Sequence, residues 1–509
     1  MGKQLFFIFL LTPLLSFSQS SKSYPAEVEA VLKKAGKNRI ELEKVITHCK
    51  KNRDPLKLKA AYFLIANMDI HYSIDYCLTD GADKKIEYNE FAYPNYDKAV
   101  QALEDIKHKT PDINVKQVVL PDIHHIKADY LIDNIERSFR AWRSSIAKNI
   151  PFADFCEYIL PYRTSVEPLQ DWRFKYQEKY KWVDDSVKVL GINKVLSYVA
   201  ADYANWFTDT YGKEQRFEPL PRLGPMQLLF RKKGACEDIV DLQVFILRSQ
   251  GLPSSMNFIS DWATSTGRHF LNSAFDEQMR TIPLDVTSPM AVDNKLYREP
   301  AKVLRTTYSK QPGTLARFEE IEDIPEGYMQ TQNYIDITKE LWETADIKCK
   351  LFPSQNSPKV AYACVYNGGN WTPTWWGKIK KDSVNFSAMG KGAVYLPAYY
   401  INNDIVPAGY PVVQGFNQEV TLIPDTVNKR TITINEQAKY LIFRPGKSYR
   451  LYYWDNDWEL VDEQIAASDA HILSFEDAPK NALFLLVPEY SQGKERPFII
   501  TDDGKRQWL

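Results

Sequence analysis

Apolar residues recur at three- and four-residue steps over the first third of the chain, with Lys and Glu between them. This spacing puts one apolar stripe along a helix and is typical of helices that cover a core. Few stretches there alternate in the manner of a strand. The pattern predicts an α-helical lobe over residues 19–184, with helices at Glu27–Leu32, Leu42–Cys49, Leu56–Met68, Tyr96–Ile106, Ile123–Ile146 and Phe152–Leu160.

The pattern changes over residues 185–350, where a helix is followed by short strands. Ile239–Ser249 has helical spacing, and the Gly251 and Pro253 that follow it are typical of a helix end. Alternation of apolar and polar residues then favours strands, so this section is expected to be an α+β domain. The expected strands are Met256–Ile259, Arg268–Phe275 and Thr281–Val286.

Short β-rich runs punctuated by Gly, Pro, Asn and Asp fill the rest of the chain. Such runs are typical of β-sandwiches, and we expect two modules, residues 351–435 and 436–509. A chain of 509 residues is also too long for one core, so a multi-domain protein is predicted. The expected strands are Val360–Tyr366, Ala393–Tyr400, Glu419–Ile423, Arg430–Ile434, Tyr440–Phe443, Tyr449–Trp454 and Ala482–Val487.

The beginning of the chain has the pattern of a signal peptide. Lys3 precedes the apolar run Leu5–Leu15, and Ser16 and Ser18 occupy the positions that a signal peptidase recognises. We therefore expect residues 1–18 to be removed before Gln19, leaving an exported protein, periplasmic or secreted to the extracellular space or cell surface. The run is too short to favour a membrane span, and no later segment approaches spanning length.

Charge and cysteine spacing exclude several classes of partner. Lys plus Arg number 64 against 65 Asp plus Glu, which provides no basic field for nucleic acid. The six cysteines are scattered without a CxxC spacing, so neither a structural metal nor any other cofactor is implied. Cys349 and Cys364 are close enough in sequence to be weighed as a disulfide.

Cys236 is predicted to begin a helix, directly after Gly234-Ala235. Unpaired N–H groups and the positive end of the helix dipole favour a thiolate there, which is the nucleophilic form of cysteine. The sequence thus predicts a Cys236 thiol with a depressed pKa, and Gly234 is expected to let the chain turn into the helix.

His269 and Asp285 are predicted to face each other across a hairpin. If Asp276-Glu277-Gln278 is a three-residue loop, position 269 lies opposite 285 on one face of the sheet. A carboxylate beside an imidazole holds one tautomer and orients it toward a thiol. Each residue alone has a plainer interpretation as packing or capping, but the order of helix-start Cys, strand His and paired-strand Asp favours a nucleophilic site.

At these residues the sequence resembles the transglutaminase-like superfamily. The similar stretches are GACEDIVDLQVFILRSQGLPSSMNFISDW, GRHFLNSAF and TIPLDVT. More narrowly, most of the mature chain resembles large exported transglutaminase-domain proteins of Bacteroidetes-type bacteria, through segments such as FCEYILPYR, VYLPAYY and YRLYYWDNDW. The resemblance implies a papain-like cysteine core over residues 185–350.

The resemblance also implies roles for individual residues. Cys236 matches the nucleophile, His269 the general base and acid, and Asp285 the residue that orients the histidine. Many members of the family have a Trp two residues after the histidine, where this chain has Leu271. The Cys236 N–H is the natural first oxyanion donor, with Gln227 and Trp262 as candidates for a second.

The expected function is cleavage of an amide or peptide bond in a protein, peptide or glycopeptide, with hydrolysis favoured over cross-linking. A cysteine peptidase or amidase and a transglutaminase-like acyl transferase therefore stay open. A non-catalytic peptide- or glycan-binding protein on the same scaffold and a glycan–asparagine amidase are the alternatives. The β-modules could contact a glycan; Trp371 and Trp375 could build a sugar platform, although core packing is the commoner outcome for such residues.

Overall fold

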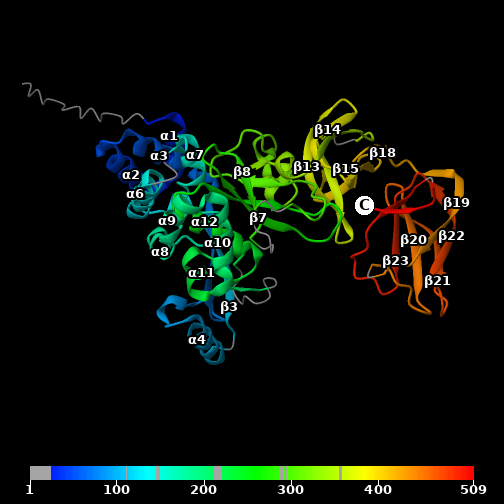
Figure 1. Ribbon diagram of the computed structural model, residues 1–509, viewed down its shortest axis with the longest axis horizontal. Coiled ribbons are helices and arrows are strands. Elements are labelled where there is room, and N and C mark those ends of the chain that lie inside the picture. The colour runs from blue at the N-terminus through cyan, green and yellow to red at the C-terminus, as the bar shows by residue number, and fades with distance from the viewer. Residues whose placement is uncertain are drawn as a thin grey trace, which may run out of the picture.

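The computed structural model describes residues 24–509 except 111, 145–148, 211–219, 287–291, 293–294, 355–357, 439 and 502, so the predicted signal peptide lies outside the described residues. Figure 1 shows four parts: the blue helices and the helices of the green section lie against each other at one end, and the yellow and red strands follow along the long axis to the other end. We call them the helical lobe (residues 24–172), the central section (173–343), the first β module (344–424) and the second β module (425–509).

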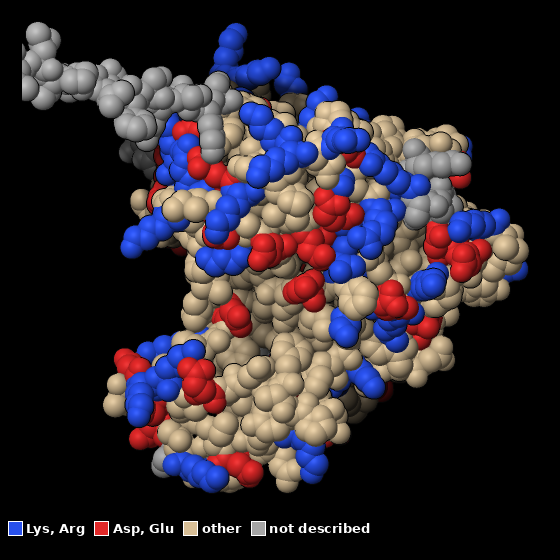
Figure 2. All heavy atoms as spheres, turned by 90° about the vertical axis from the view of Figure 1, so that its left-hand side faces the viewer, with Lys and Arg blue, Asp and Glu red and all other residues tan. Residues whose placement is uncertain are grey.

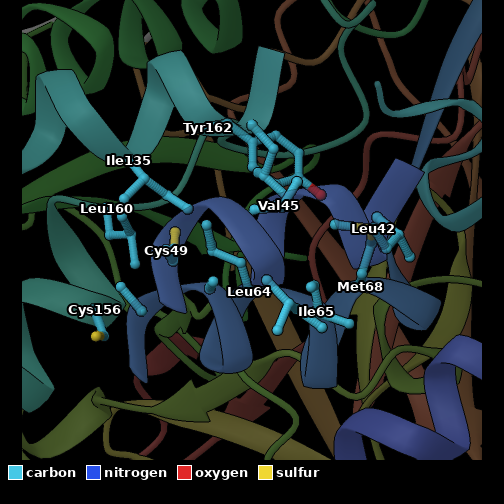
Figure 3. Close-up of a cluster of buried hydrophobic side chains, with 14 of the residues drawn as sticks. Leu42, Val45, Cys49, Leu64, Ile65, Met68, Ile135, Cys156, Leu160 and Tyr162 are labelled. Atoms are coloured by element: carbon cyan, nitrogen blue, oxygen red, sulfur yellow. The ribbon is translucent and has the colours of Figure 1, made fainter. Parts of the chain in front are cut away.

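The helical lobe packs its amphipathic helices around one apolar core. Leu42, Cys49, Leu64 and Ile135 come from three different helices and are almost completely buried against one another. Figure 3 shows these side chains converging between the helices, with the sulfur atoms of Cys49 and Cys156 inside the cluster. The helices are α1 (Ala26–Lys34), α2 (Arg39–Lys51), α3 (Pro55–Asn67), α4 (Tyr96–Lys109), α5 (Asp122–His125), α6 (Ala128–Ser144) and α7 (Phe152–Tyr158).

A small antiparallel sheet, which the sequence pattern did not predict, interrupts the helical lobe. Strands β1 (Tyr72–Thr79) and β3 (Asn114–Pro121) pair along their whole length, and β2 (Lys85–Ile86) adds to the other edge of β1. Most of their side chains are only half-buried or exposed. The strands therefore lack the clean alternation on which a sequence-based strand prediction depends.

The central section places helix α12 against a five-stranded sheet. Its strand order is β10-β9-β6-β7-β8, so β7 lies between its sequence neighbours. Burial of Leu242, Phe245 and Ile246 against Ala274 and Leu284 explains why α12 lies on this sheet. The elements are α8 (Arg173–Lys179), α9 (Trp182–Leu190), α10 (Ile192–Asp202), β4 (Thr208–Asp209), α11 (Pro225–Arg231), β5 (Lys233–Gly234), α12 (Cys236–Ser249), β6 (Ser254–Ile259), β7 (His269–Phe275), β8 (Thr281–Leu284), β9 (Leu304–Thr306), β10 (Tyr334–Asp336) and α13 (Thr338–Leu341).

The hairpin of β7 and β8 has a longer loop than the sequence suggested. Phe275 pairs with Thr281, so the connection has five residues instead of three and the register moves by two positions. Extending the observed pairing by one step puts Asp285 opposite Leu271 instead of His269. Because side chains alternate with a period of two, a shift of two keeps Asp285 on the same face as His269.

The first β module begins earlier than the sequence suggested. Strand β11 (Thr344–Lys350) pairs with β14 and buries Ile347 and Cys349 in the core of this module, so residues 344–350 belong to it and not to the central section. Its strands form one continuous hydrogen-bonded sheet instead of the two sheets of a sandwich. The others are β12 (Val360–Asn367), β13 (Asn370–Lys380), β14 (Ser383–Gly390), β15 (Ala393–Ile401), β16 (Asp404–Pro407), β17 (Val412–Gln414) and β18 (Glu419–Thr421).

The second β module contains two sheets that share one core. Strand β19 (Asp425–Asn435) pairs with β22, which places residue 435 inside this module and moves its boundary to about residue 425. Tyr440–Phe443, a predicted strand, is a turn with a single bridge at Leu441. The remaining strands are β20 (Ser448–Trp454), β21 (Trp458–Ile465), β22 (Ile472–Lys480), β23 (Phe484–Pro488), β24 (Phe498–Ile500) and β25 (Arg506–Trp508).

A fragment comprising residues 344–509 is expected to be more stable than one comprising residues 352–509. The shorter fragment loses β11, and with it the burial of Ile347 and Cys349, which are 0% and 3% exposed. Removing these two side chains and the backbone hydrogen bonds between β11 and β14 should lower the free energy of unfolding by at least about 3 kcal/mol. Urea denaturation of both fragments measures the difference; equal midpoints would mean that β11 is dispensable.

All six cysteines are free thiols in the structure. Cys349 and Cys364 do not form the disulfide weighed above, because Cys349 packs in the core that contains Phe386 and Cys364 in another core that contains Tyr362.

The part of the chain described contains no helix long and apolar enough to cross a membrane. On the face shown in Figure 2, acidic and basic side chains are interspersed, in keeping with the balanced composition.

Candidate functional site

Cys236 is the first residue of α12, as the sequence predicted. The helix start is fixed by Asp238, whose carboxylate accepts hydrogen bonds from the backbone N–H groups of Ala235 (2.8 Å) and Leu223 (3.0 Å). Gly234 is needed for this close approach, since a Cβ atom there would lie 2.8 Å from the Asp238 side chain. Glycine therefore serves here to make space, and its φ is not positive.

His269 and Asp285 form the pair that the hairpin predicted. The His269 Nε2 atom lies 2.9 Å from the Asp285 Oδ2 atom, and both residues are buried, at 9% and 4% exposure. A carboxylate at this distance favours the tautomer with its proton on Nε2, which leaves the Nδ1 lone pair to accept a proton from another group. The imidazole is thus oriented by its partner, as a general base requires.

Helix α12 and strand β7 bring Cys236 and His269 to the same end of the central section. Further along both elements, the Asn272 amide donates to the Val240 carbonyl at 3.0 Å. At their beginnings, the Arg222 guanidinium donates to the Glu237 carbonyl at 2.7 Å and lies 4.5 Å from the Phe270 ring centre. Arg222 therefore bridges the residue after Cys236 and the residue after His269.

The Cys236 thiol is engaged by Glu237. Its Sγ atom donates to the Glu237 Oε2 atom at 3.2 Å, and no hydrogen bond joins the thiol to His269 among the residues with described positions. Burial, together with the charge and hydrogen bond of Glu237, raises the pKa of Cys236 to about 12. The prediction of a depressed pKa is therefore wrong for this arrangement, because desolvation and a neighbouring carboxylate outweigh the helix N-terminus.

The pKa of Glu237 itself is lowered, although burial opposes this. Its backbone N–H and the Arg222 charge both stabilise the carboxylate. The residue following the candidate nucleophile thus stays anionic at neutral pH. Sequence reasoning missed its role, even though an acidic side chain adjacent to Cys236 was a visible signal.

Aromatic rings flank His269. The Trp262 ring stacks on the imidazole, with centroids 5.7 Å apart and planes inclined by 24°. The Tyr297 ring approaches edge-on at 6.3 Å and is 64% exposed, so it stands at the solvent side of the pair. Leu271, at the position where many family members carry Trp, is 2% exposed and packs in a core with Trp262 instead of lining an open pocket.

Of the two candidates for a second oxyanion donor, only Trp262 is still available. The Gln227 amide donates to Glu90 at 2.8 Å, and its carbonyl accepts from the Gly224 N–H at 2.7 Å, so this side chain holds the helical lobe to α11. The Trp262 indole N–H makes no hydrogen bond within the described parts of the chain and lies beside His269.

Among the described residues, no group of three or more His, Cys, Asp or Glu side chains is arranged to hold a metal ion.

The tip of the β12–β13 hairpin holds the segment that leads into His269. The Asn367 amide donates to the carbonyls of Trp262 (3.2 Å), Ser265 (3.1 Å) and Gly267 (3.2 Å), and its oxygen accepts from the Gly267 N–H at 3.1 Å. One side chain of the first β module thereby satisfies four backbone groups of residues 262–267. The sequence had no signal for this contact, since the two segments are about a hundred residues apart.

Asn367→Ala is expected to loosen this segment. Water would replace the lost hydrogen bonds only in part, so the free energy of unfolding should fall by about 1–2 kcal/mol. The Trp262 ring would also lose its fixed position on His269, which near-ultraviolet circular dichroism would report. Asn370→Ala, an exposed position in the same turn, is the matched control and should change neither quantity. Equal effects of both variants would exclude a specific role for Asn367.

Comparisons with known proteins leave the family unassigned. No protein-family model matches the chain, and no curated protein matches it either. Among solved structures the chain is similar to red sea bream transglutaminase, with 9% identity over 87% of this chain and 77% of that chain, at a TM-score of 0.20. The name of that enzyme agrees with the superfamily that the sequence resembles, but a superposition as loose as this carries no argument about fold or activity.

Proposed function

We propose that this protein is an exported cysteine-nucleophile enzyme of the transglutaminase-like type that acts on an amide or peptide bond. The observation that carries the proposal is the His269–Asp285 pair, whose Nε2 and Oδ2 atoms are 2.9 Å apart. His269 is the first residue of β7, and Cys236 is the first residue of the neighbouring helix α12. The signal-peptide pattern of residues 1–18 supports the proposed export. The proposed substrate is a protein, peptide or glycopeptide outside the cytoplasm.

In the proposed reaction, the Cys236 thiol leaves Glu237 and gives its proton to the His269 Nδ1 atom. The thiolate attacks the amide carbonyl, and the oxyanion is held by the Cys236 N–H at the start of α12 and by the Trp262 indole. His269 then protonates the leaving amine as the C–N bond breaks, which leaves a thioester on Cys236. Water, deprotonated by His269, releases the acid and restores the thiol. Hydrolysis is favoured because nothing among the described residues marks a site for an acceptor amine.

A second candidate function is supported by the Cys236–Glu237 contact. A thiol whose pKa is raised to about 12 has almost no thiolate at neutral pH, which suits a binding protein on a transglutaminase-like scaffold. In the enzyme, by contrast, substrate must displace the thiol from Glu237. The two functions therefore differ in whether an acyl group is ever transferred to Cys236.

Trapping with a library of peptide and amide electrophiles distinguishes the two. The enzyme predicts a covalent adduct on Cys236, located by mass spectrometry, that is absent in Cys236→Ser and at least tenfold slower to form in His269→Ala. The Cys77 thiol, which is half-buried and far away in sequence, is the internal control. Labelling of Cys77 but not of Cys236 by every electrophile would contradict an enzyme and favour the binding protein.

A further inference from the structure

Arg222 is a buried cation at the junction between helix α12 and the sheet, and the proposed reaction gives it no part. It is 6% exposed and lies just before α11 in the chain. The next residue, Leu223, donates its backbone N–H to the Asp238 carboxylate at 3.0 Å, so the chain around Arg222 is fixed against the first turn of α12. Arg222 therefore has a defined place beside the helix that begins with Cys236.

The Arg222 guanidinium contacts two points near the start of α12. One of its nitrogens donates to the Glu237 carbonyl at 2.7 Å and to the Asp241 Oδ2 atom at 3.2 Å. Asp241 is completely buried, and burial raises the pKa of its carboxyl although the Arg222 charge opposes this rise. The cation thus stabilises a carboxylate inside the protein, and the carboxylate in turn holds the cation against the helix.

The same guanidinium contacts two neighbouring strands of the sheet. Its other terminal nitrogen donates to the Met256 Sδ atom of β6 at 3.0 Å, and its centre lies 4.5 Å from the ring centre of Phe270 in β7. A planar cation on an aromatic face is a favourable contact, and more so where water is excluded. One side chain therefore joins the start of α12 to the start of β7, where His269 is the first residue.

We propose that Arg222 is a positioning residue for the proposed reaction, on which this inference rests, and that it holds Cys236 within reach of His269. A displacement of about 1 Å between reacting groups can cost about a hundredfold in rate, so a shift of α12 on the sheet would be costly. The Asn272 amide, which donates to the Val240 carbonyl, fixes the helix one turn further along. Arg222 fixes the end of the helix that carries the thiol.

The test measures the proximity of the two elements directly, in the full mature chain with His269→Cys. The protein is treated with dibromobimane, which has two arms that each alkylate a thiol. After one arm has reacted with Cys236, the other either closes onto the thiol at position 269 or is quenched by added glutathione. Mass spectrometry gives the ratio of the two products, which reports the effective concentration of one thiol at the other. Arg222→Met is expected to lower this ratio by about tenfold or more.

Arg231→Met is the matched control. Arg231 is also 6% exposed, pairs with Glu90 at 2.7 Å and lies 5.0 Å from the ring centre of Tyr96, but it joins α11 to the helical lobe. Its loss should lower the melting temperature and leave the cross-linking ratio unchanged. Arg222→Lys keeps the charge, but one ammonium group cannot reach the helix and both strands together. This variant should therefore lower the ratio as well, and it replaces Arg222→Met if that variant fails to fold.

Four outcomes would overturn the inference. They are equal ratios with and without Arg222, no cross-link even with Arg222 intact, an equal decrease in Arg231→Met, and full cross-linking in Arg222→Lys. The first would leave the proposed reaction untouched.

Trapping at Cys236 gives a second readout. His269→Ala should slow adduct formation when Arg222 is intact and have no further effect in Arg222→Met, because the two residues are then already out of reach. Additive effects of the two changes would count against positioning. If no electrophile reacts with Cys236 while the cross-linking ratio still depends on Arg222, the proposed reaction fails and the positioning of the two elements stands.

Discussion

Asp285→Asn is expected to slow acyl transfer to Cys236 by about a hundredfold or more. Asparagine keeps the size of the side chain but presents an amide N–H to the His269 Nε2 atom, which now binds Asp285 Oδ2 at 2.9 Å. The ring would then carry its proton on Nδ1, the nitrogen that has to accept one. The corresponding change in a serine-protease triad costs about 10⁴-fold in rate; a thiol is more acidic than a hydroxyl, so a smaller loss is expected.

The rate is measured with the electrophile identified by the trapping experiment, alongside the melting temperature of the same preparation. Asp276→Asn is the matched control, because Asp276 lies in the same hairpin and caps its turn by accepting from the N–H groups of Gln278 and Arg280. It should lower the melting temperature and leave the rate per folded molecule unchanged. The opposite pattern, with Asp285→Asn affecting stability alone, would make Asp285 a structural residue.

Glu237→Gln is expected to raise the rate of Cys236 alkylation by iodoacetamide at pH 7.5 by about tenfold or more. The Glu237 carboxylate contributes to raising the pKa of Cys236 to about 12, so removing its charge lowers that pKa and moves the rate–pH profile to lower pH. Each unit by which the pKa of Cys236 falls gives about tenfold more thiolate, and the lower basicity of that thiolate offsets part of the gain.

Glu277→Gln provides the control for the change in net charge, because Glu277 is an exposed residue of the β7–β8 loop. Its alkylation profile should overlay that of the unchanged protein. If the alkylation profile of Glu237→Gln also overlays that of the unchanged protein, burial alone raises the pKa of Cys236. The hydrogen bond to Glu237 would then have no part in restraining the thiol.

Local patterns predicted the candidate site better than its surroundings. The start of α12 at Cys236 followed from helical spacing, and the His269–Asp285 contact followed from strand alternation. The latter prediction succeeded despite an error of two positions in register, since an even shift preserves the face of a strand. An odd shift would have separated the two residues.

Features that depend on contacts distant in sequence could not be predicted in this way. The pKa of Cys236 depends on burial by the assembled section, and Arg222 joins α12 to β7 through contacts that no local spacing encodes. The module boundaries were displaced for a similar reason. Strands β11 and β19 each lie beside a stretch of turn residues, and only their ladders with β14 and β22 show to which module they belong.

The contact between Asn367 and residues 262–267 constrains the evolution of this chain. A gene exchange that joined the central section to a first β module from elsewhere would preserve both cores, yet it would remove the amide that holds the Trp262, Ser265 and Gly267 carbonyls. Recombinants at that junction should therefore fold and still lose the geometry around His269. The two parts are expected to be inherited together, with the hairpin tip and the segment before His269 varying in concert.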